Sequence, residues 1–235
     1  MPTILLLETA TEVCSAAISQ NGKVIALKEH SGGNSHSELL TLFIEEMLTE
    51  CSISAASLNA VCVSKGPGSY TGLRIGVSVA KGLCYALGIP LMAVNTLEAQ
   101  ATYVARNSEA LGVTIDSNTL LCPMTDARRM EVYTALFDFK ANQLSEIEAK
   151  IIDSGSFEAQ LKLHPMVFFG NGADKCKAAL SNKNALFIDD FQASARFMSD
   201  LAEHYWVQNK FEDVAYFEPF YLKNFLATIP KNKII

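Results

Sequence analysis

The sequence predicts an α/β fold in which a mixed sheet carries helices on its faces. Asn21-Gly22 joins two apolar runs and is the dipeptide most typical of a tight β-hairpin. Later segments with the spacing of amphipathic helices alternate with short apolar runs, which is the order of parallel βαβ crossovers. The turn Gly66-Pro67-Gly68 joins one such run to a helix. We therefore expect a hairpin-led sheet that continues into parallel strands.

The first 107 residues contain expected elements in the order β-β-β-α-β-α-β-α. Strands are expected at residues 3–8, 14–19, 23–29, 60–64 and 91–94. Helices are expected at residues 37–51, 71–87 and 96–106. Ser35 and Glu38 fit a capping box at the start of the first helix, and Gly88 followed by Pro90 fits the end of the second.

The second half of the chain has weaker signals. Strands are expected at residues 120–125, 132–139, 148–153 and 167–170, and helices at residues 156–163 and 198–209. Gly170-Asn171-Gly172-Ala173 follows the last of these strands, and a helix is expected after it. Small polar residues gather within residues 107–118, so the chain is expected to divide into subdomains at 1–107 and 108–235.

Composition limits the class of function. The chain has 235 residues, 49% of them hydrophobic, and a net charge of −6. An acidic chain is not expected to bind nucleic acid by itself. A local basic patch such as Arg128-Arg129 could still contact nucleic acid, bind a carboxylate or have no such role. The six cysteines form no C-x-x-C, which argues against a zinc site and favours a reduced, cytoplasmic location. No run is long enough for a signal or membrane segment.

The helix at residues 71–87 keeps an unusual row of small residues. Gly72, Gly76, Ala80 and Cys84 recur every four residues, with Leu73, Val77 and Lys81 on an adjacent row. Such a row allows close packing, either on the chain's own sheet or on a helix of another subunit. We favour a partner, which the apolar residues of the first helix could also contact. The expected interface residues are Leu39, Leu40, Phe43, Met47, Gly72, Leu73, Gly76, Val77, Ala80, Lys81 and Cys84.

Other candidate sites are less specific. Glu8-Thr9 ends the first strand and could hold Mg²⁺ and phosphate, but Ala10 stands where a phosphate turn prefers glycine, which favours a plain hairpin turn. Gly170 and Gly172 could admit a nucleotide or form an ordinary turn. The glycine turn lacks the lysine of a Walker A loop. His36 lacks the partners of a catalytic triad and is expected to cap a helix or lie at the surface.

Four segments together resemble the TsaB (YeaZ) family. They are residues 36–40 (HSELL), 66–76 (GPGSYTGLRIG), 124–133 (MTDARRMEVY) and 219–223 (PFYLK), and they span most of the chain in the right order. The resemblance implies an actin-like, Hsp70-like ATPase (ASKHA) fold with two subdomains, each with a mixed sheet and flanking helices. It also implies a cytoplasmic role in making N6-threonylcarbamoyladenosine at position 37 of tRNA.

The resemblance implies partners as well. TsaD, the catalytic paralogue, is expected to form a heterodimer with this chain, and TsaE is expected to join them. A homodimer is expected when TsaD is absent. Contact with tRNA is expected only through the complex, and no membrane is implied.

The same resemblance implies that this chain is not itself an enzyme. After its corresponding strand TsaD carries V-H-H-M-E-G-H, whose second and third histidines form an H-x-x-x-H pair that holds a metal, whereas this chain has Thr96 and Gln100 at those places. Neither replaces imidazole on a transition metal. We therefore expect no catalytic residue, no metal and no cofactor bound by the chain alone. A site for ATP or ADP that a partner completes, with Glu8, Thr9, Gly170 and Gly172, stays open.

The alternative hypothesis is a free-standing actin-like ATPase or kinase, or a glycoprotease-type peptidase. A kinase of this fold needs an acidic residue and a glycine phosphate turn, of which only the acid is present. A peptidase needs metal ligands or a triad, and the sequence shows neither.

Overall fold

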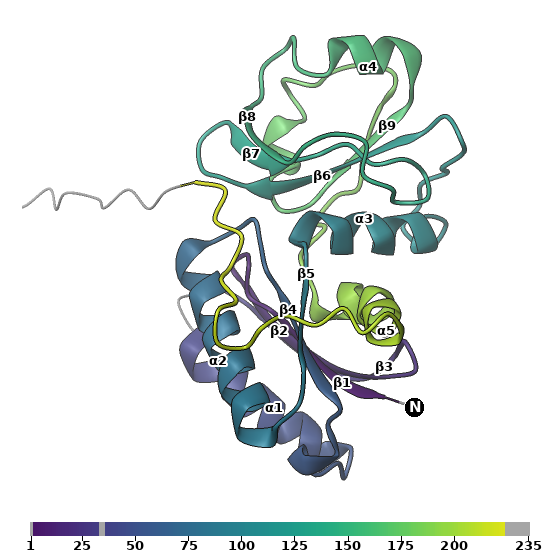
Figure 1. Ribbon diagram of the computed structural model, residues 1–235. Coiled ribbons are helices and arrows are strands. Elements are labelled where there is room, and N and C mark those ends of the chain that lie inside the picture. The colour runs from purple at the N-terminus through teal and green to yellow at the C-terminus, as the bar shows by residue number, and fades with distance from the viewer. Residues whose placement is uncertain (1, 33–35, 224–235) are drawn as a thin grey trace, which may run out of the picture.

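The chain folds into two lobes, each built on a five-stranded sheet (Figure 1). The structure is a computed structural model, and it describes residues 2–32 and 36–223. The first sheet has the strand order β3-β2-β1-β4-β5, and the second has the order β10-β9-β6-β7-β8. Ser35, expected to cap the first helix, lies outside the described residues.

The first lobe follows the predicted order of elements. Its strands are β1 (Thr3–Glu8), β2 (Val13–Gln20), β3 (Lys23–Ser31), β4 (Ala60–Ser64) and β5 (Leu91–Val94). Its helices are α1 (His36–Glu50), α2 (Tyr70–Leu87) and α3 (Thr96–Asn107), with a short 3₁₀ turn η1 (Ala55–Ser57) before β4. β1 pairs antiparallel with β2 and parallel with β4, so hairpin and crossovers share one sheet as predicted.

Local residues explain where these elements turn and end. Asn21 and Gly22 both have positive φ, and Gln20 pairs with Lys23 across them, which is the two-residue hairpin expected from Asn-Gly. Ser69 caps α2 by accepting a hydrogen bond from the Gly72 N–H. Gly88 ends α2 in the left-handed conformation, as predicted.

β1 is buried on both faces and separates two hydrophobic layers. Leu5 and Leu7 pack in the layer that holds α1 and α2, whereas Ile4 and Leu6 pack in the layer that holds α3 and α5 (Ser199–Val207). Successive side chains of a strand point to opposite faces, so the uninterrupted apolar run of β1 follows from this double burial.

The second lobe contains shorter elements than predicted. Its strands are β6 (Leu120–Asp126), β7 (Glu131–Thr134), β8 (Glu148–Ile151), β9 (Met166–Phe169) and β10 (Ala185–Phe187), and its helix is α4 (Glu158–Leu163). The expected strand at 132–139 was too long, because β7 ends at Thr134 and Phe137 forms only isolated bridges. The helix expected after residues 170–173 is wrong, since the chain forms a 3₁₀ turn, η2 (Asp174–Cys176), and further turns.

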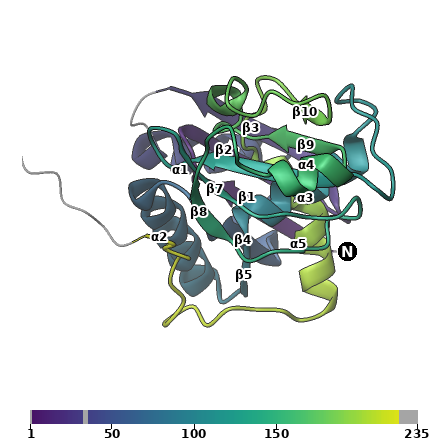
Figure 2. The ribbon, with the colours of Figure 1, turned by 90° about the horizontal axis from the view of Figure 1, so that it is seen from above.

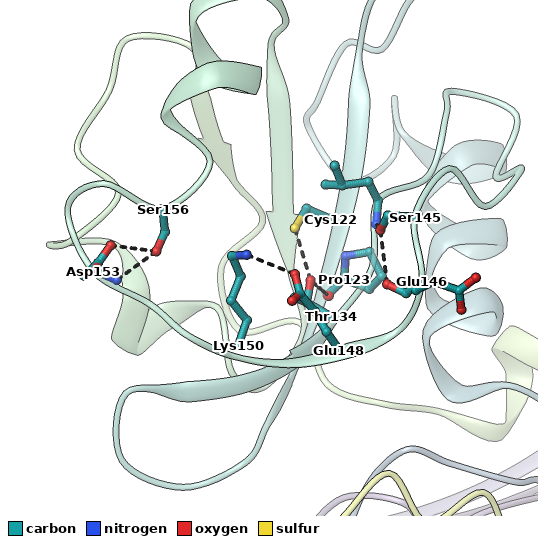
Figure 3. Close-up of polar contacts among 10 residues, drawn as sticks. Cys122, Pro123, Thr134, Ser145, Glu146, Glu148, Lys150, Asp153 and Ser156 are labelled. Atoms are coloured by element: carbon teal, nitrogen blue, oxygen red, sulfur yellow. Dashed lines mark hydrogen bonds and ion pairs between the residues drawn. The ribbon is translucent and has the colours of Figure 1, made fainter.

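A proline in β6 marks where this strand changes partners. Residues before and including Pro123 pair with β9, and residues from Met124 onward pair with β7. The hydroxyl of Thr134 on β7 donates to the Pro123 carbonyl at 2.8 Å and lies 3.3 Å from the sulfur of Cys122 (Figure 3). This side-chain hydrogen bond ties β7 to β6 at the residue that cannot donate one of its own.

The end of the chain returns to the first lobe. After β10, η3 (Ala195–Met198) and α5 pack on the first sheet, and the segment 208–223 crosses from α5 to α2 (Figures 1 and 2). We call residues 208–223 the strap. These segments lie in the predicted subdomain 108–235 by sequence, and they pack on the sheet formed by residues of 1–107. Within the described part of the chain, no helix is both long and apolar enough to cross a membrane.

Candidate functional site

The row of glycines on α2 receives the chain's own first turn. Thr9 Oγ1 donates to the Gly72 carbonyl at 2.8 Å, and the N–H of Ser69 donates to the Ala10 carbonyl at 2.7 Å. A Cβ on Gly72 would overlap the Thr9 carbonyl oxygen, and one on Gly76 would overlap the Thr9 hydroxyl. The glycines are therefore required because the β1–β2 turn lies directly against the helix.

This packing corrects the predicted partner surface on the inner side of α2. Val77, Ala80 and Cys84 are buried in the layer on the first sheet. Gly72 and Gly76 are buried against Thr9 of the β1–β2 turn, and Leu73 is buried beside Gly66. On α1, three expected interface residues are buried in the same layer: Leu40, Phe43 and Met47. These residues leave almost no surface for another molecule, because the chain's own strands and the β1–β2 turn cover them.

Lys81, another expected interface residue, is engaged by the strap. Its Nζ donates to the carbonyls of Ala215 and Phe217, both at 3.1 Å. Phe217 itself is buried in the layer beneath α2. Lys81 therefore fixes the strap along the helix, a role that its sequence neighbours did not indicate because the strap is more than 130 residues away.

The outer side of the helix pair remains accessible. Ile75, Val79 and Leu83 recur at four-residue spacing on α2 and are half-buried at the edge of the layer. On α1, Leu39 is half-buried and Leu42 is 44% exposed. We call these five residues the outer apolar face. Of the residues predicted for a partner, only Leu39 belongs to it.

The side chain of Glu8 points into the interior of the protein. Its side chain is buried, and Oε1 accepts a hydrogen bond from the Ala10 N–H at 2.5 Å. Burial raises the pKa of Glu8 to about 7, and the hydrogen bond from Ala10 opposes part of that rise. With Glu8 turned inward and the Thr9 hydroxyl bonded to α2, these two side chains do not fit a phosphate or Mg²⁺ site in this structure.

Thr96 and Gln100 are also engaged inside the protein. Thr96 begins α3, and its hydroxyl lies 2.7 Å from that of Ser64 on β4. Gln100, one turn later, places Nε2 3.5 Å from the Thr125 hydroxyl on β6, while its buried Oε1 has no hydrogen-bond partner among the described residues. Across residues 2–32 and 36–223, no group of three or more His, Cys, Asp or Glu side chains is placed so that it could hold a metal. These two positions thus link α3 to both sheets.

Gly170 and Gly172 repeat, in the second lobe, the packing seen around α2. A Cβ on Gly170 would overlap the Met124 carbonyl oxygen, and one on Gly172 would lie 2.9 Å from Val132 Cγ1. The Gly172 N–H donates to the Met124 carbonyl at 2.9 Å. The loop packs on β6 and β7, so both glycines have a structural reason to be there.

A cleft of about 940 Å³ lies between the two lobes. Its walls combine the β1–β2 turn, the start of α2, the β6–β7 hairpin and the end of the strap. His36 lines it and places Nε2 3.0 Å from the Thr11 carbonyl. The cleft's aromatic residues are Tyr70, Tyr133 and Tyr221. Sequence reasoning singled out the segments that carry these tyrosines but did not bring them together.

The chain is similar to proteins of one tRNA-modification family. It matches the sequence model of a family described as TsaD, tRNA N6-adenosine threonylcarbamoyltransferase, over residues 24–225. The tRNA threonylcarbamoyladenosine biosynthesis protein TsaB of Bacillus subtilis is 31% identical over 86% of this chain and 82% of the relative. TsaB of Escherichia coli is 30% identical over 95% of this chain and 96% of the relative.

Solved structures agree on the fold. YeaZ from Pseudomonas aeruginosa has a TM-score of 0.78 at 22% identity, covering 94% of this chain and 100% of that one. A protein described as similar to the peptidase YeaZ from Pseudomonas aeruginosa has a TM-score of 0.79 at 23% identity, covering 95% and 100%. The predicted actin-like fold with two mixed sheets and flanking helices is confirmed.

Proposed function

The chain belongs to the TsaB family, and on that premise we propose that it is a non-catalytic scaffold subunit for N6-threonylcarbamoyladenosine formation on tRNA. Relatives that match most of its length are named as biosynthesis proteins of this modified nucleoside, so a role in the modification follows. The proposal adds to this that the chain acts as a scaffold for another subunit and does not catalyse the reaction itself.

The observation that carries the scaffold role is the engagement of Thr96 and Gln100. In the paralogue TsaD, which the resemblance identifies as catalytic, metal-binding histidines stand at these positions. Here the Thr96 hydroxyl is paired with Ser64, and the Gln100 amide reaches Thr125. Hydroxyl and amide groups are poor ligands for a transition metal, and these two already link α3 to the strands around it. The fold is kept while the imidazole ligands are replaced.

We propose that TsaD binds the outer apolar face of α1 and α2, with TsaE joining the pair. The aliphatic side chains of this face lie beside two small exposed residues of α2, Ser78 and Gly82, that let another helix approach closely. A stable interface of standard size covers roughly 800 Å² per partner. Because the paralogue has the same fold, its own helix pair can meet this one about a pseudo-twofold axis. A homodimer through the same face is expected when TsaD is absent.

The test is tRNA modification reconstituted from purified components with and without this chain. We expect modification to be lost on omission and restored by the wild-type chain. A matched control is Lys162→Gln, which changes an exposed residue on α4, away from the outer apolar face. Full modification without the chain would remove the proposed function. Metal-dependent turnover by the isolated chain would instead favour a free-standing enzyme.

A further inference from the structure

The β6–β7 hairpin holds two arginines in a backbone conformation that arginine rarely adopts. Arg128 and Arg129 have φ values of 71° and 51°, both in the left-handed region. At the tip of the β2–β3 hairpin two successive residues also have positive φ, but they are Asn21 and Gly22, which tolerate it well. The β6–β7 hairpin therefore has arginine at two positions whose positive φ arginine disfavours.

Neither arginine has a structural task that explains this strain. Both are exposed, and neither guanidinium forms an ion pair or hydrogen bond within residues 2–32 and 36–223. The carboxylates beside the hairpin are already matched, because Asp126 pairs with Lys175 and Glu131 pairs with Lys223.

The hairpin thus carries two positive charges without an ion-pair partner among the described residues, in a chain whose net charge is −6. Glu12, on the opposite wall, is the other carboxylate that lines the cleft. The local excess of positive charge favours an anionic ligand.

The cleft beside the hairpin carries a row of aromatic and basic side chains. The rings of Tyr70 and Tyr221 are 4.8 Å apart, and Arg74 lies 5.6 Å from the centre of the Tyr70 ring. The next residues along the wall are Lys223 and Tyr133, whose Nζ and ring centre are 5.9 Å apart. Arg128 lines the same cleft. The row therefore runs from α2, across the end of the strap, to the hairpin.

We propose that this wall binds a single-stranded segment of RNA, with Arg128 and Arg129 on its phosphates and Tyr221 stacking on a base. Guanidinium groups suit phosphate oxygens because they donate two parallel hydrogen bonds. Unpaired bases in RNA loops bind by stacking on exposed aromatic rings, and Tyr221 is 36% exposed. The inference rests on the proposed function, since the RNA is then the tRNA substrate. It goes beyond that function by giving this subunit a direct contact with the substrate.

The test replaces Arg128 and Arg129 by residues that tolerate positive φ. The double variant Arg128→Asn with Arg129→Gly is expected to fold at least as stably as wild type, because Asn and Gly favour positive φ. In the complex with TsaD, its affinity for a fluorescent anticodon stem-loop RNA is expected to fall about tenfold or more, with a salt dependence lower by about one per arginine. The control is Arg106→Gln with Arg196→Gln, which removes the same charge elsewhere and should leave RNA affinity unchanged.

Three outcomes would overturn the inference. Unchanged RNA affinity in the Asn-Gly variant, with modification still dependent on the chain, leaves the proposed function standing and removes the RNA contact. Weaker TsaD binding in sedimentation, with unchanged RNA affinity of the complex formed at saturating TsaD, assigns the arginines to an acidic protein surface. If the variant loses binding to ATP, used as a second probe, while its RNA affinity is unchanged, the arginines are assigned to a free nucleotide.

The stacking contact has its own variant, Tyr221→Ala. A fall in RNA affinity similar to that of the Asn-Gly variant supports the contact.

Discussion

The two sides of α2 differ both in the size of their side chains and in what they contact. The inner side carries Gly72 and Gly76, which lie against the Thr9 backbone and side chain, and it is closed by the first sheet. The outer side carries Ile75, Val79 and Leu83, which are only half-buried. A row of small residues on a helix therefore predicts close packing, but it does not identify the segment that packs there.

The largest expected effect is on the inner side. Gly72→Ala places a Cβ into the Thr9 carbonyl oxygen, which belongs to the backbone and cannot rotate away. We expect a loss of about 3 kcal/mol in the free energy of unfolding, measured with urea. Gly82→Ala is the matched control, since nothing lies within 4 Å of its added Cβ and alanine favours a helix by up to about 1 kcal/mol. Equal effects of the two changes would contradict the packing described for the inner side.

A second effect concerns the pH dependence of stability that comes from Glu8, at the end of β1. The pKa of Glu8 is raised by burial to about 7, from 4.5 in the unfolded chain. Because the folded pKa is the higher one, the folded state holds more protons, and stability falls as pH rises from about 4.5 through 7. The expected fall is up to about 3 kcal/mol. Glu8→Gln removes this dependence while keeping an acceptor for the Ala10 N–H, so the variant should exceed wild type in stability at pH 8. Parallel urea curves for the two proteins across this pH range would argue against a buried, neutral Glu8.

A smaller effect is expected where the strap crosses α2. Lys81→Met removes two hydrogen bonds to strap carbonyls but keeps the aliphatic stem. We expect about 1 kcal/mol less stability and faster hydrogen exchange at the amides of Glu212 and Phe220, which bond to Leu91 and Lys65. Arg106→Met, on α3, should leave these two exchange rates unchanged. Unaltered exchange in Lys81→Met would mean that other contacts hold the strap.

Local patterns were enough to predict the first lobe. The Asn21-Gly22 turn, the apolar run of β1 and the Gly88 helix end each depend on neighbours in sequence, and all three were predicted correctly. The helix expected after Gly172 was not found, because residues there close a series of tight turns that bury Cys176 and Leu180 before β10.

The candidate site was harder to predict because its parts are far apart in the chain. The strap reaches α2 from more than 130 residues away, and it brings Tyr221 to Tyr70. The inner and outer sides of α2 could not be told apart either, since that requires knowing that the β1–β2 turn lies on the glycine row. The positions of Thr96 and Gln100 were readable from the resemblance, but their partners Ser64 and Thr125 were not.

Calorimetric titration of TsaD with Val79→Arg tests whether TsaD binds the outer apolar face. Val79 lies in the middle of the outer row, so an arginine there places a charge inside the proposed interface without entering the core. Calorimetric titration is expected to show affinity lower by about a hundredfold or more, with urea unfolding close to wild type. Lys162→Glu on α4 should bind TsaD normally. Wild-type affinity of a folded Val79→Arg variant would show that TsaD does not bind this face.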